Sequence, residues 1–200
     1  MNDKRLFAPS TARNRQPIFD VLRNVLPAKG LALEIASGAG EHVTFFAEHL
    51  PHLTFRPSDP SAEARESIAA WIAESGLSNV LAPLVLDVEA FPWPVGAADA
   101  IICINMIHIS PWSSTQALFE GAGRTLPAGA PLYLYGPYRR GGAHTAPSNA
   151  AFDASLRARN PSWGIRDLDE VAEVAREKGF GEPQVVEMPA NNLSVIFRRR

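Results

Sequence analysis

The apolar run Ala100–Ile104 is the segment that most constrains the fold. Its five residues, Ala-Ile-Ile-Cys-Ile, include no polar side chain. A strand points successive side chains to opposite faces, so both faces of this strand must be covered. Strands covered on both faces are typical of parallel sheets that have helices packed on each side. We therefore expect an interior strand of an α/β fold at this position.

Strand and helix patterns alternate around this run. Further apolar strand patterns fall at residues 31–35, 53–56, 80–86 and 132–135. Helical spacing of apolar residues occurs at 16–26, 41–50, 61–75, 115–126 and 167–178. Such alternation favours an α/β fold in which a doubly wound parallel sheet carries helices on both faces.

The C-terminal end of the chain departs from this alternation. Segments 184–187 and 194–198 both have strand patterns, and only a turn around Pro189 to Asn192 separates them. Strands joined so closely should pair antiparallel. We therefore predict a Rossmann-like, seven-stranded sheet that is mostly parallel and has an antiparallel last strand.

The chain length indicates one domain. Two hundred residues are expected to fold as a single unit over 1–200, with an N-terminal helical segment in 1–30. Residues 136–166 are rich in Gly, Pro, Asn and Arg, and a short helix is predicted around 150–158. A connection of that length is usually functional, so we interpret it as a lid or a wall of the substrate site.

Composition and charge exclude several classes of function. The net charge of -2 offers no field that would attract a nucleic acid. The sequence shows neither a signal pattern nor an apolar run of membrane-spanning length, so we expect a cytoplasmic protein without a membrane partner. Cys103 is the single cysteine and cannot form an intramolecular disulfide. The five histidines lack the spacing of a metal site, so no metal is expected.

A glycine-containing turn follows the strand predicted at 31–35. Gly38 and Gly40 lack side chains, so the backbone can turn tightly there and approach a ligand closely. The helix predicted at 41–50 begins directly afterwards and leaves its first N–H groups unpaired. Ligands of doubly wound sheets bind beyond the carboxyl ends of the strands, so this turn suits a nucleotide or a carboxylate. An ordinary strand-to-helix corner is the alternative.

Acidic residues follow the next two predicted strands. Asp59 lies nineteen positions beyond Gly40, a spacing at which a carboxylate can accept the ribose hydroxyls of a nucleotide. Asp87 and Val88 come after the strand predicted at 80–86, where a carboxylate and a backbone N–H can bind adenine. A turn or cap role for Asp87 is the alternative. Together these positions predict a nucleotide cofactor.

These segments resemble the ordered motifs of class I S-adenosylmethionine-dependent methyltransferases. The resemblance covers about residues 30–135 and rests on EIASGAG at 34–40, Asp59, Asp87, DAIICIN at 99–105 and GRTLPAGA at 123–130. That family has a seven-stranded sheet whose last strand is inserted antiparallel, which agrees with the pattern of the C-terminal strands here. Ala36 departs from the family, which usually has glycine at that position.

A narrower resemblance spans nearly the whole chain. The chain is similar to a methyltransferase-like family of unknown function that occurs in bacteria and animals. This similarity rests on Pro9, RNRQPI at 13–18, NAAFD at 149–153 and PSWGIRD at 161–167. It implies the same fold and defines no substrate.

The resemblance implies that S-adenosylmethionine is the cofactor. The implied binding residues are Glu34, Ala36, Ser37, Gly38, Gly40, Asp59, Pro60, Asp87, Val88 and Asn105. Gly38 and its neighbours would hold the methionyl part, Asp59 the ribose, and Asp87 with Val88 the adenine. Glu34 would bind the amine, directly or through water. A strand-end carboxylate satisfied by neighbouring N–H groups is the alternative for Glu34.

Methyl transfer from a sulfonium depends on positioning and desolvation and needs no universal catalytic residue. For a hydroxyl or amine acceptor, His108 is the candidate general base, and a structural buried histidine is the alternative. We expect a small-molecule acceptor. The residues expected to bind it, with surface or packing roles as alternatives, are Arg13, Asn14, Tyr138, Asn149, Trp163 and Arg166.

Two other functions compete with a methyltransferase. A nicotinamide-dependent oxidoreductase would need a third small residue where this chain has Glu41, His42 and Val43, and the antiparallel end is unexpected for it. A cofactor-binding or interaction protein without transfer activity could keep the same motifs, because methyl transfer requires no obligatory catalytic side chain.

Overall fold

The computed structural model describes residues 3–200, so residues 1–2 of the expected domain lie outside the described part. Its centre is a six-stranded sheet with the order β2-β1-β3-β4-β8-β7. The strands are β1 (Gly30–Ile35), β2 (Leu53–Pro57), β3 (Ala100–Ile104), β4 (Pro131–Pro137), β7 (Gln184–Met188) and β8 (Asn192–Arg198). The first four in this order run parallel, and β8 is antiparallel to both β4 and β7. The doubly wound sheet with an antiparallel last strand is therefore confirmed.

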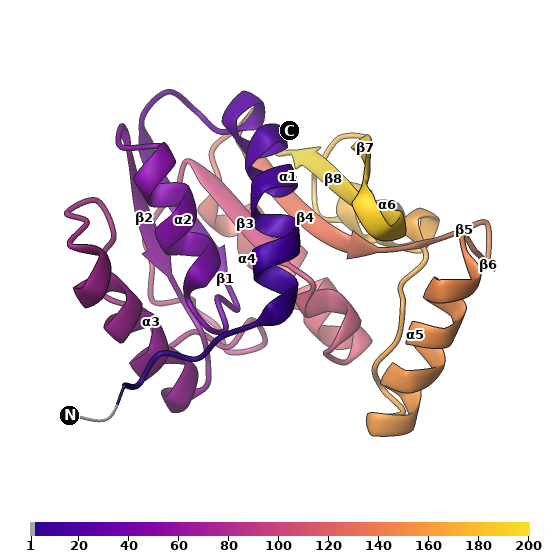
Figure 1. Ribbon diagram of the computed structural model, residues 1–200. Coiled ribbons are helices and arrows are strands. Elements are labelled where there is room, and N and C mark those ends of the chain that lie inside the picture. The colour runs from indigo at the N-terminus through magenta and orange to yellow at the C-terminus, as the bar shows by residue number, and fades with distance from the viewer. Residues whose placement is uncertain (1–2) are drawn as a thin grey trace.

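Helices cover both faces of the sheet (Figure 1). They are α1 (Pro9–Val25), α2 (Glu41–His49), α3 (Ala62–Ser75), α4 (Trp112–Thr125), α5 (Pro147–Arg159) and α6 (Leu168–Glu177), with short 3-10 turns η1 (Met106–His108) and η2 (Pro189–Asn191). Among residues 3–200, no helix is long and apolar enough to cross a membrane.

Strand β3 lies in the interior of the sheet, as its apolar run predicted. Ala100 and Ile102 belong to the core that α1 and α2 cover, whereas Ile101 and Cys103 belong to the core under α4 and α6. All four residues are buried. Alternation along one strand thus supplies both cores, which is why no polar residue is tolerated there.

The predicted strand at 80–86 is wrong in detail, and the sheet has six strands where seven were predicted. The segment runs beside β2 but makes only isolated bridges, from Val80 to Phe55 and from Leu84 to Ser58. Pro83 lies between these bridges and has no N–H to donate to a ladder. The segment therefore follows the edge of the sheet without forming a continuous strand.

Three helices begin earlier than the sequence indicated, and one of them is α4, which begins at Trp112 and not at residue 115. Helix α1 begins at Pro9, before the predicted 16–26, and a proline costs little in a first turn because that N–H has no helical partner. Of residues 9–15 only Thr11 is buried, so apolar periodicity could not reveal these turns. Arg13 and Asn14 therefore lie within a helix and not before it. Helix α5 likewise extends beyond the predicted 150–158 at both ends.

The segment 136–166 contains a small hairpin and α5. Strands β5 (Arg139–Arg140) and β6 (Ala143–His144) pair antiparallel. Helix α5 stands to one side of the central sheet, at the right of the view (Figure 1). Its buried residues are Asn149, Asp153 and Leu156. The segment is therefore an ordered projection next to the sheet, and its role as a wall of the substrate site stays a prediction.

Candidate cofactor and acceptor site

The turn between β1 and α2 has a left-handed backbone at three positions. The φ angles of Ala36, Gly38 and Gly40 are 53°, 56° and 95°. A Cβ added to Gly40 would lie 2.8 Å from the Cα of Ile68, so this position excludes a side chain. A Cβ added to Gly38 would meet nothing within 4 Å, so the backbone there is open to a ligand. The turn presents bare backbone at the carboxyl end of β1.

Glu34 buries a carboxyl group near this turn. The residue is 2% exposed, and its Oε2 has no hydrogen-bond partner among residues 3–200. Burial, together with the negative charge of Asp59, raises the pKa of Glu34 to about 8. Neighbouring N–H groups therefore do not satisfy the whole carboxyl group. A buried acceptor without a donor is typical of a site that a ligand completes.

Asp59 lies against the same turn. Its carboxylate accepts hydrogen bonds from the N–H of Gly38 at 3.0 Å and the N–H of Ser61 at 2.9 Å. Each carboxylate oxygen has two lone pairs, so the group is oriented and can still accept further bonds. Ser37 joins the two strand ends, since its N–H donates to the carbonyl of Ser58 at 2.9 Å.

The remaining predicted cofactor residues lie at neighbouring strand ends. Pro60 and Asp87 are exposed, and Val88 is buried. The carboxylate of Asp87 accepts a bond from the N–H of Glu89 at 3.0 Å, which is the turn geometry that the sequence left as an alternative. Asn105 follows β3 with a φ of 63°. These contacts are compatible with a ligand on Asp87 but do not require one.

A pocket of about 790 Å³ opens beside Asn105, and we call it the Asn105 pocket. Helix α1, the ends of β3 and β4, helix α5 and the β7–β8 turn contribute its walls. The lining residues are Ser10, Arg13, Asn14, Pro17, Asn105, Ile109, Tyr135, Pro137, Ser148, Asn149, Phe152, Pro189, Ala190, Asn191 and Asn192. The structure therefore brings three predicted acceptor residues, Arg13, Asn14 and Asn149, to one pocket with Asn105.

Hydrogen bonds hold two of these side chains in place. Asn14 Oδ1 lies 2.9 Å from Nε2 of His42. Burial, with the positive charge of Arg15, lowers the pKa of His42 to about 4, so the ring is neutral and can donate to Asn14. Asn149 is 5% exposed, and its Nδ2 donates to the carbonyl of Asn191 at 3.0 Å. Both amides are thus positioned before any ligand arrives.

His108 and Tyr138 lie in the interior and not in the Asn105 pocket. His108 is 1% exposed, and its Nδ1 accepts a hydrogen bond from the N–H of Arg166 at 3.3 Å. Burial and the charge of Arg166 lower the pKa of His108 to about 3. The ring of Tyr138 meets the ring of His108 edge-on at 5.0 Å. Nε2 of His108 has no hydrogen-bond partner among residues 3–200, so the ring is buried but only partly satisfied, and its role as a base stays a prediction.

Arg166 and Trp163 also lie outside the pocket lining. Nε of Arg166 donates to the carbonyl of Ile107 at 2.8 Å, and its Nη2 donates to the carbonyls of Ser110 and Ser162. The guanidinium thus ties the loop after β3 to residue 162. Trp163 is half-buried, and the guanidinium of Arg159 lies 5.5 Å from its ring. These contacts show packing roles for both residues.

Sequence reasoning missed several residues of the Asn105 pocket. Tyr135 was placed at the end of a predicted strand, and β4 extends past it to Pro137, so this tyrosine stands at the carboxyl end of the sheet. Ile109 and Phe152 looked like ordinary apolar residues of a loop and a helix. The pair Asn191 and Asn192 carried a detectable signal, because asparagine favours the left-handed turn that Asn191 adopts with a φ of 57°.

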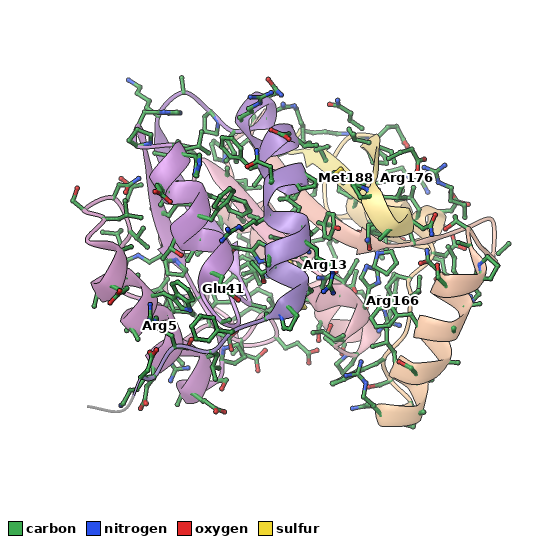
Figure 2. The ribbon with its side chains drawn as sticks, viewed as in Figure 1. Arg5, Arg13, Glu41, Arg166, Arg176 and Met188 are labelled. Carbon is green, nitrogen blue, oxygen red and sulfur yellow. The ribbon has the colours of Figure 1, made fainter. Side chains whose placement is uncertain are left out.

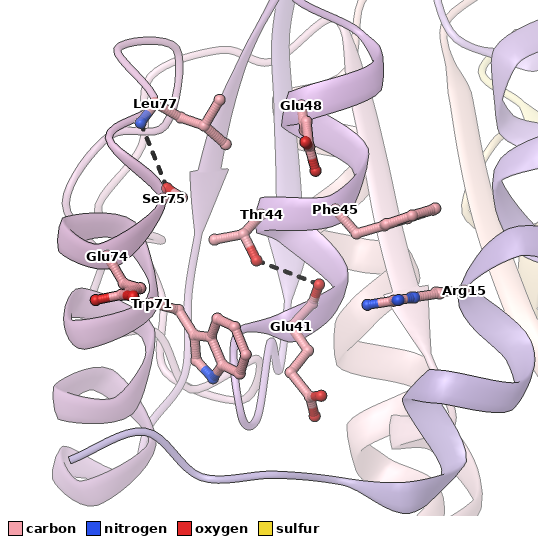
Figure 3. A pocket seen from close by; sticks show the side chains of 9 residues that line it. All are labelled: Arg15, Glu41, Thr44, Phe45, Glu48, Trp71, Glu74, Ser75 and Leu77. Atoms are coloured by element: carbon pink, nitrogen blue, oxygen red, sulfur yellow. Dashed lines mark hydrogen bonds between the residues drawn. The ribbon is translucent and has the colours of Figure 1, made fainter. Parts of the chain in front are cut away.

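A smaller hollow of about 200 Å³ lies on the outer helical layer (Figure 3). It is lined by residues of α1, α2, α3 and the residue Leu77 just after α3. Arg15 lies over the ring of Phe45, with 4.8 Å between the guanidinium carbon and the ring centre. None of the predicted site residues lines this hollow.

A comparison with protein-family models matches residues 5–199 to a family described as a protein of unknown function, DUF938. The chain belongs to the DUF938 family. This finding confirms the similarity to a methyltransferase-like family over nearly the whole DUF938 chain.

Solved structures share the fold of this DUF938 chain. An O-methyltransferase family protein from Burkholderia thailandensis has a TM-score of 0.81 and 17% identity, covering 95% of this chain and 57% of that one. CalO1, a methyltransferase of calicheamicin biosynthesis in its SAH-bound form, has a TM-score of 0.76 and 15% identity, with 96% and 54% covered. YcgJ from Bacillus subtilis has a TM-score of 0.72 and 15% identity, with 94% and 99% covered. The DUF938 chain thus spans little more than half of the first two proteins.

Proposed function

We propose that this protein is an S-adenosylmethionine-dependent methyltransferase that acts on a small molecule. The observation that carries the proposal is the buried, unpartnered Oε2 of Glu34 beside the glycine turn. A buried carboxyl oxygen without a donor fits a ligand that brings a positively charged donor. The amine of the methionyl part of the cofactor is such a donor. The fold shared with methyltransferases supports this choice of ligand.

The neighbouring residues fit the rest of the cofactor. The bare backbone at Gly38 would accept the methionyl part, and Asp59 keeps lone pairs for the two ribose hydroxyls. Asp87 is exposed and would take the exocyclic amine of adenine, with the N–H of Val88 for a ring nitrogen. Each part of the cofactor therefore has a group of matching chemistry at consecutive strand ends.

When bound, the cofactor supplies a methyl group that the sulfonium activates for displacement. The chain contributes positioning, because the Asn105 pocket would hold the acceptor and exclude water from it. Among the residues lining this pocket there is no Asp, Glu, His or Lys. Burial raises the pKa of Tyr135, so its hydroxyl stays protonated and acts as a donor. The acceptor therefore has to be nucleophilic without a general base from the pocket lining.

Calorimetric titration with S-adenosylmethionine, S-adenosylhomocysteine and NAD tests the proposal. We expect both sulfur compounds to bind and NAD to give no response. Binding of NAD and of neither sulfur compound would overturn the proposal and indicate an oxidoreductase.

Asp59→Ala sharpens this test. Loss of a charge-assisted contact should weaken S-adenosylhomocysteine binding by more than about 1 kcal/mol, or about fivefold. Asp20→Ala removes an exposed carboxylate of α1 outside the site and is the matched control. Equal affinity of wild type and Asp59→Ala would show that Asp59 does not hold the ribose.

A cofactor-binding protein without transfer activity is the second candidate, and the absence of Asp, Glu, His and Lys, the side chains that could act as a general base, among the pocket-lining residues favours it. Incubation with methyl-labelled S-adenosylmethionine and a panel of small acceptors separates the two. Label in any acceptor supports the methyltransferase, whereas cofactor binding with no transfer across the panel supports the binding protein.

A further inference from the structure

We propose that the Asn105 pocket takes a small organic anion, with a carboxylate or phosphate head on an apolar body, and that Arg13 is its counter-ion. This inference rests on the proposed function, because it names the class of acceptor for the same site. A carboxylate and a phosphate both present anionic oxygens in a planar or tetrahedral group. A guanidinium can bind two of these oxygens through two parallel N–H···O hydrogen bonds.

The first argument for an anionic ligand is the charge of the side chains that line the pocket. Arg13 is the single charged side chain among the lining residues, and the others are neutral. Within residues 3–200, no carboxylate lies within 4.0 Å of Arg13, and its guanidinium makes no hydrogen bond to a side chain or carbonyl. Arg166, in contrast, donates to three backbone carbonyls. Arg13 therefore offers its full set of donors to a ligand.

The second argument is the direction in which the Arg13 side chain leaves α1. In the view of Figure 2 the side chain leaves α1 on the side where Arg166 and α5 lie, away from α2, and it lines the pocket. Glu41, at the start of α2, instead accepts from the N–H of Ala8 at 2.6 Å. Glu41 is thus engaged elsewhere, and neither it nor Glu48, the other acid of α2, pairs with Arg13 in the described part of the chain.

The third argument, for an apolar body of the ligand, is the presence of apolar side chains on two walls of the pocket. Ile109, after β3, is 43% exposed, and Phe152, on α5, is 41% exposed, and both line the pocket. Large apolar side chains left in water across one pocket favour a ligand with an apolar body, because burial gains about 25 cal/mol per Å². The volume of about 790 Å³ fits a small molecule. The ligand is therefore amphipathic, with one anionic end.

Benzoate, phenyl phosphate, benzamide and benzylamine are the probes, because they share one apolar ring and differ in charge. Each is titrated by saturation-transfer NMR and calorimetry, with and without S-adenosylhomocysteine. We expect both anions to bind about tenfold or more tightly than benzamide, and the benzylammonium ion not to bind. Equal affinity for benzoate and benzamide, or no binding of either anion, overturns the proposal.

Arg13→Gln assigns the preference to one residue. Anion affinity should fall about tenfold or more, while the affinities for benzamide and S-adenosylhomocysteine stay within about threefold of wild type. Arg13→Lys should keep part of the preference, because it keeps the charge and loses the fork. Arg23→Gln, on the last turn of the same helix, is the matched control and should change nothing.

The outcomes separate this inference from the proposed function. An Arg13→Gln variant that loses S-adenosylhomocysteine binding overturns the inference, because Arg13 then serves the cofactor. A wild-type protein that binds no S-adenosylhomocysteine overturns the proposed function, and the anion titrations without cofactor still decide the anion site. A retained preference for anions in Arg13→Gln overturns the role of Arg13.

Discussion

At the scale of single residues, Glu34 is one of six side chains with a buried polar atom that has no hydrogen-bond partner among residues 3–200. Burying an acid without a full set of partners costs free energy, and the group responds by holding its proton. Ser58 and Ser37 direct their hydroxyls to the backbone carbonyl of Glu34 and leave Oε2 unpaired. A glutamine or an apolar residue would avoid the cost of burying this acid, and the proposed ligand amine would supply the missing donor.

The raised pKa of Glu34 predicts a pH dependence of stability. The pKa is 4.5 for the unfolded chain and about 8 in the native state, so between these values the native state binds one more proton. The contribution of Glu34 to the free energy of unfolding therefore falls as pH rises through this window, by up to about 1.4 kcal/mol per pH unit. Above pH 6.5 His42 and His108 do not oppose this effect, so urea unfolding at several pH values between 6.5 and 8 should show the decline in wild type and its loss in Glu34→Gln. The exposed Glu48→Gln is the control and should behave as wild type, and an unchanged slope in Glu34→Gln would contradict the assignment.

Ala36 predicts a second effect at this scale. An alanine at a φ of 53° is strained by about 1 kcal/mol relative to glycine. Ala36→Gly should therefore raise the free energy of unfolding by about 0.5 kcal/mol after the added freedom of the unfolded chain is subtracted. Ala39→Gly in the same turn relieves no left-handed strain and should destabilise the protein by a similar amount. Chemical denaturation of both variants checks the difference in sign.

At the scale of elements, the attachment of α5 determines the shape of the Asn105 pocket. Asp153 accepts from the N–H of Ile165 at 2.6 Å, and Leu156 is fully buried, so the middle of the helix is fixed to the segment that follows it. Near its start, Asn149 connects α5 to the carbonyl of Asn191 in the β7–β8 turn. Two walls of the pocket are thus joined by one amide.

Asn149→Ala should loosen this connection. Loss of the hydrogen bonds to Asn191 and Thr145 removes about 1 kcal/mol of local stability, so amides of α5 should exchange about fivefold faster. Hydrogen exchange followed by mass spectrometry measures this rate. Ser155→Ala changes an exposed residue of the same helix and is the control. Equal exchange in wild type and Asn149→Ala would mean that Asp153 and Leu156 alone hold the helix.

At the scale of the whole molecule, three buried groups set the pH of greatest stability. His42 and His108 have native pKa values of about 4 and about 3 against 6.5 in the unfolded chain, so stability is lost as pH falls below 6.5. Glu34 acts in the opposite sense between 4.5 and about 8. Between pH 4.5 and 6.5 the two histidines favour proton binding by the unfolded chain more than Glu34 favours it in the native state, so the free energy of unfolding rises with pH. Above pH 6.5 only Glu34 contributes, and the free energy of unfolding falls. Thermal melts across pH should therefore peak near about pH 6.5, and a rise in melting temperature continuing to pH 8 would contradict this balance.

The predictable parts of the fold were those that local pattern controls. The apolar run Ala100–Ile104 could only be an interior strand, and the short link at residues 189–191 could only join antiparallel neighbours. Pro83 shows where local pattern fails, since an apolar segment with strand spacing lost its ladder at one missing N–H. The first turns of α1 were invisible because tertiary contacts of polar side chains, and not an apolar face, position them.

For the site, the sequence by itself determined the glycine turn between β1 and α2 and the acids that follow the next strand segments. The chain order of strands and turns places this turn and these acids at one edge of the sheet. Only the tertiary structure decided which side chains face a ligand. Arg166 and His108 are far apart in sequence, yet the fold brings the backbone N–H of the half-buried Arg166 to the buried ring of His108. It also left Oε2 of Glu34 without a donor and Arg13 without an acid. Burial and pairing depend on what packs around a residue, and distant parts of the chain supply those neighbours.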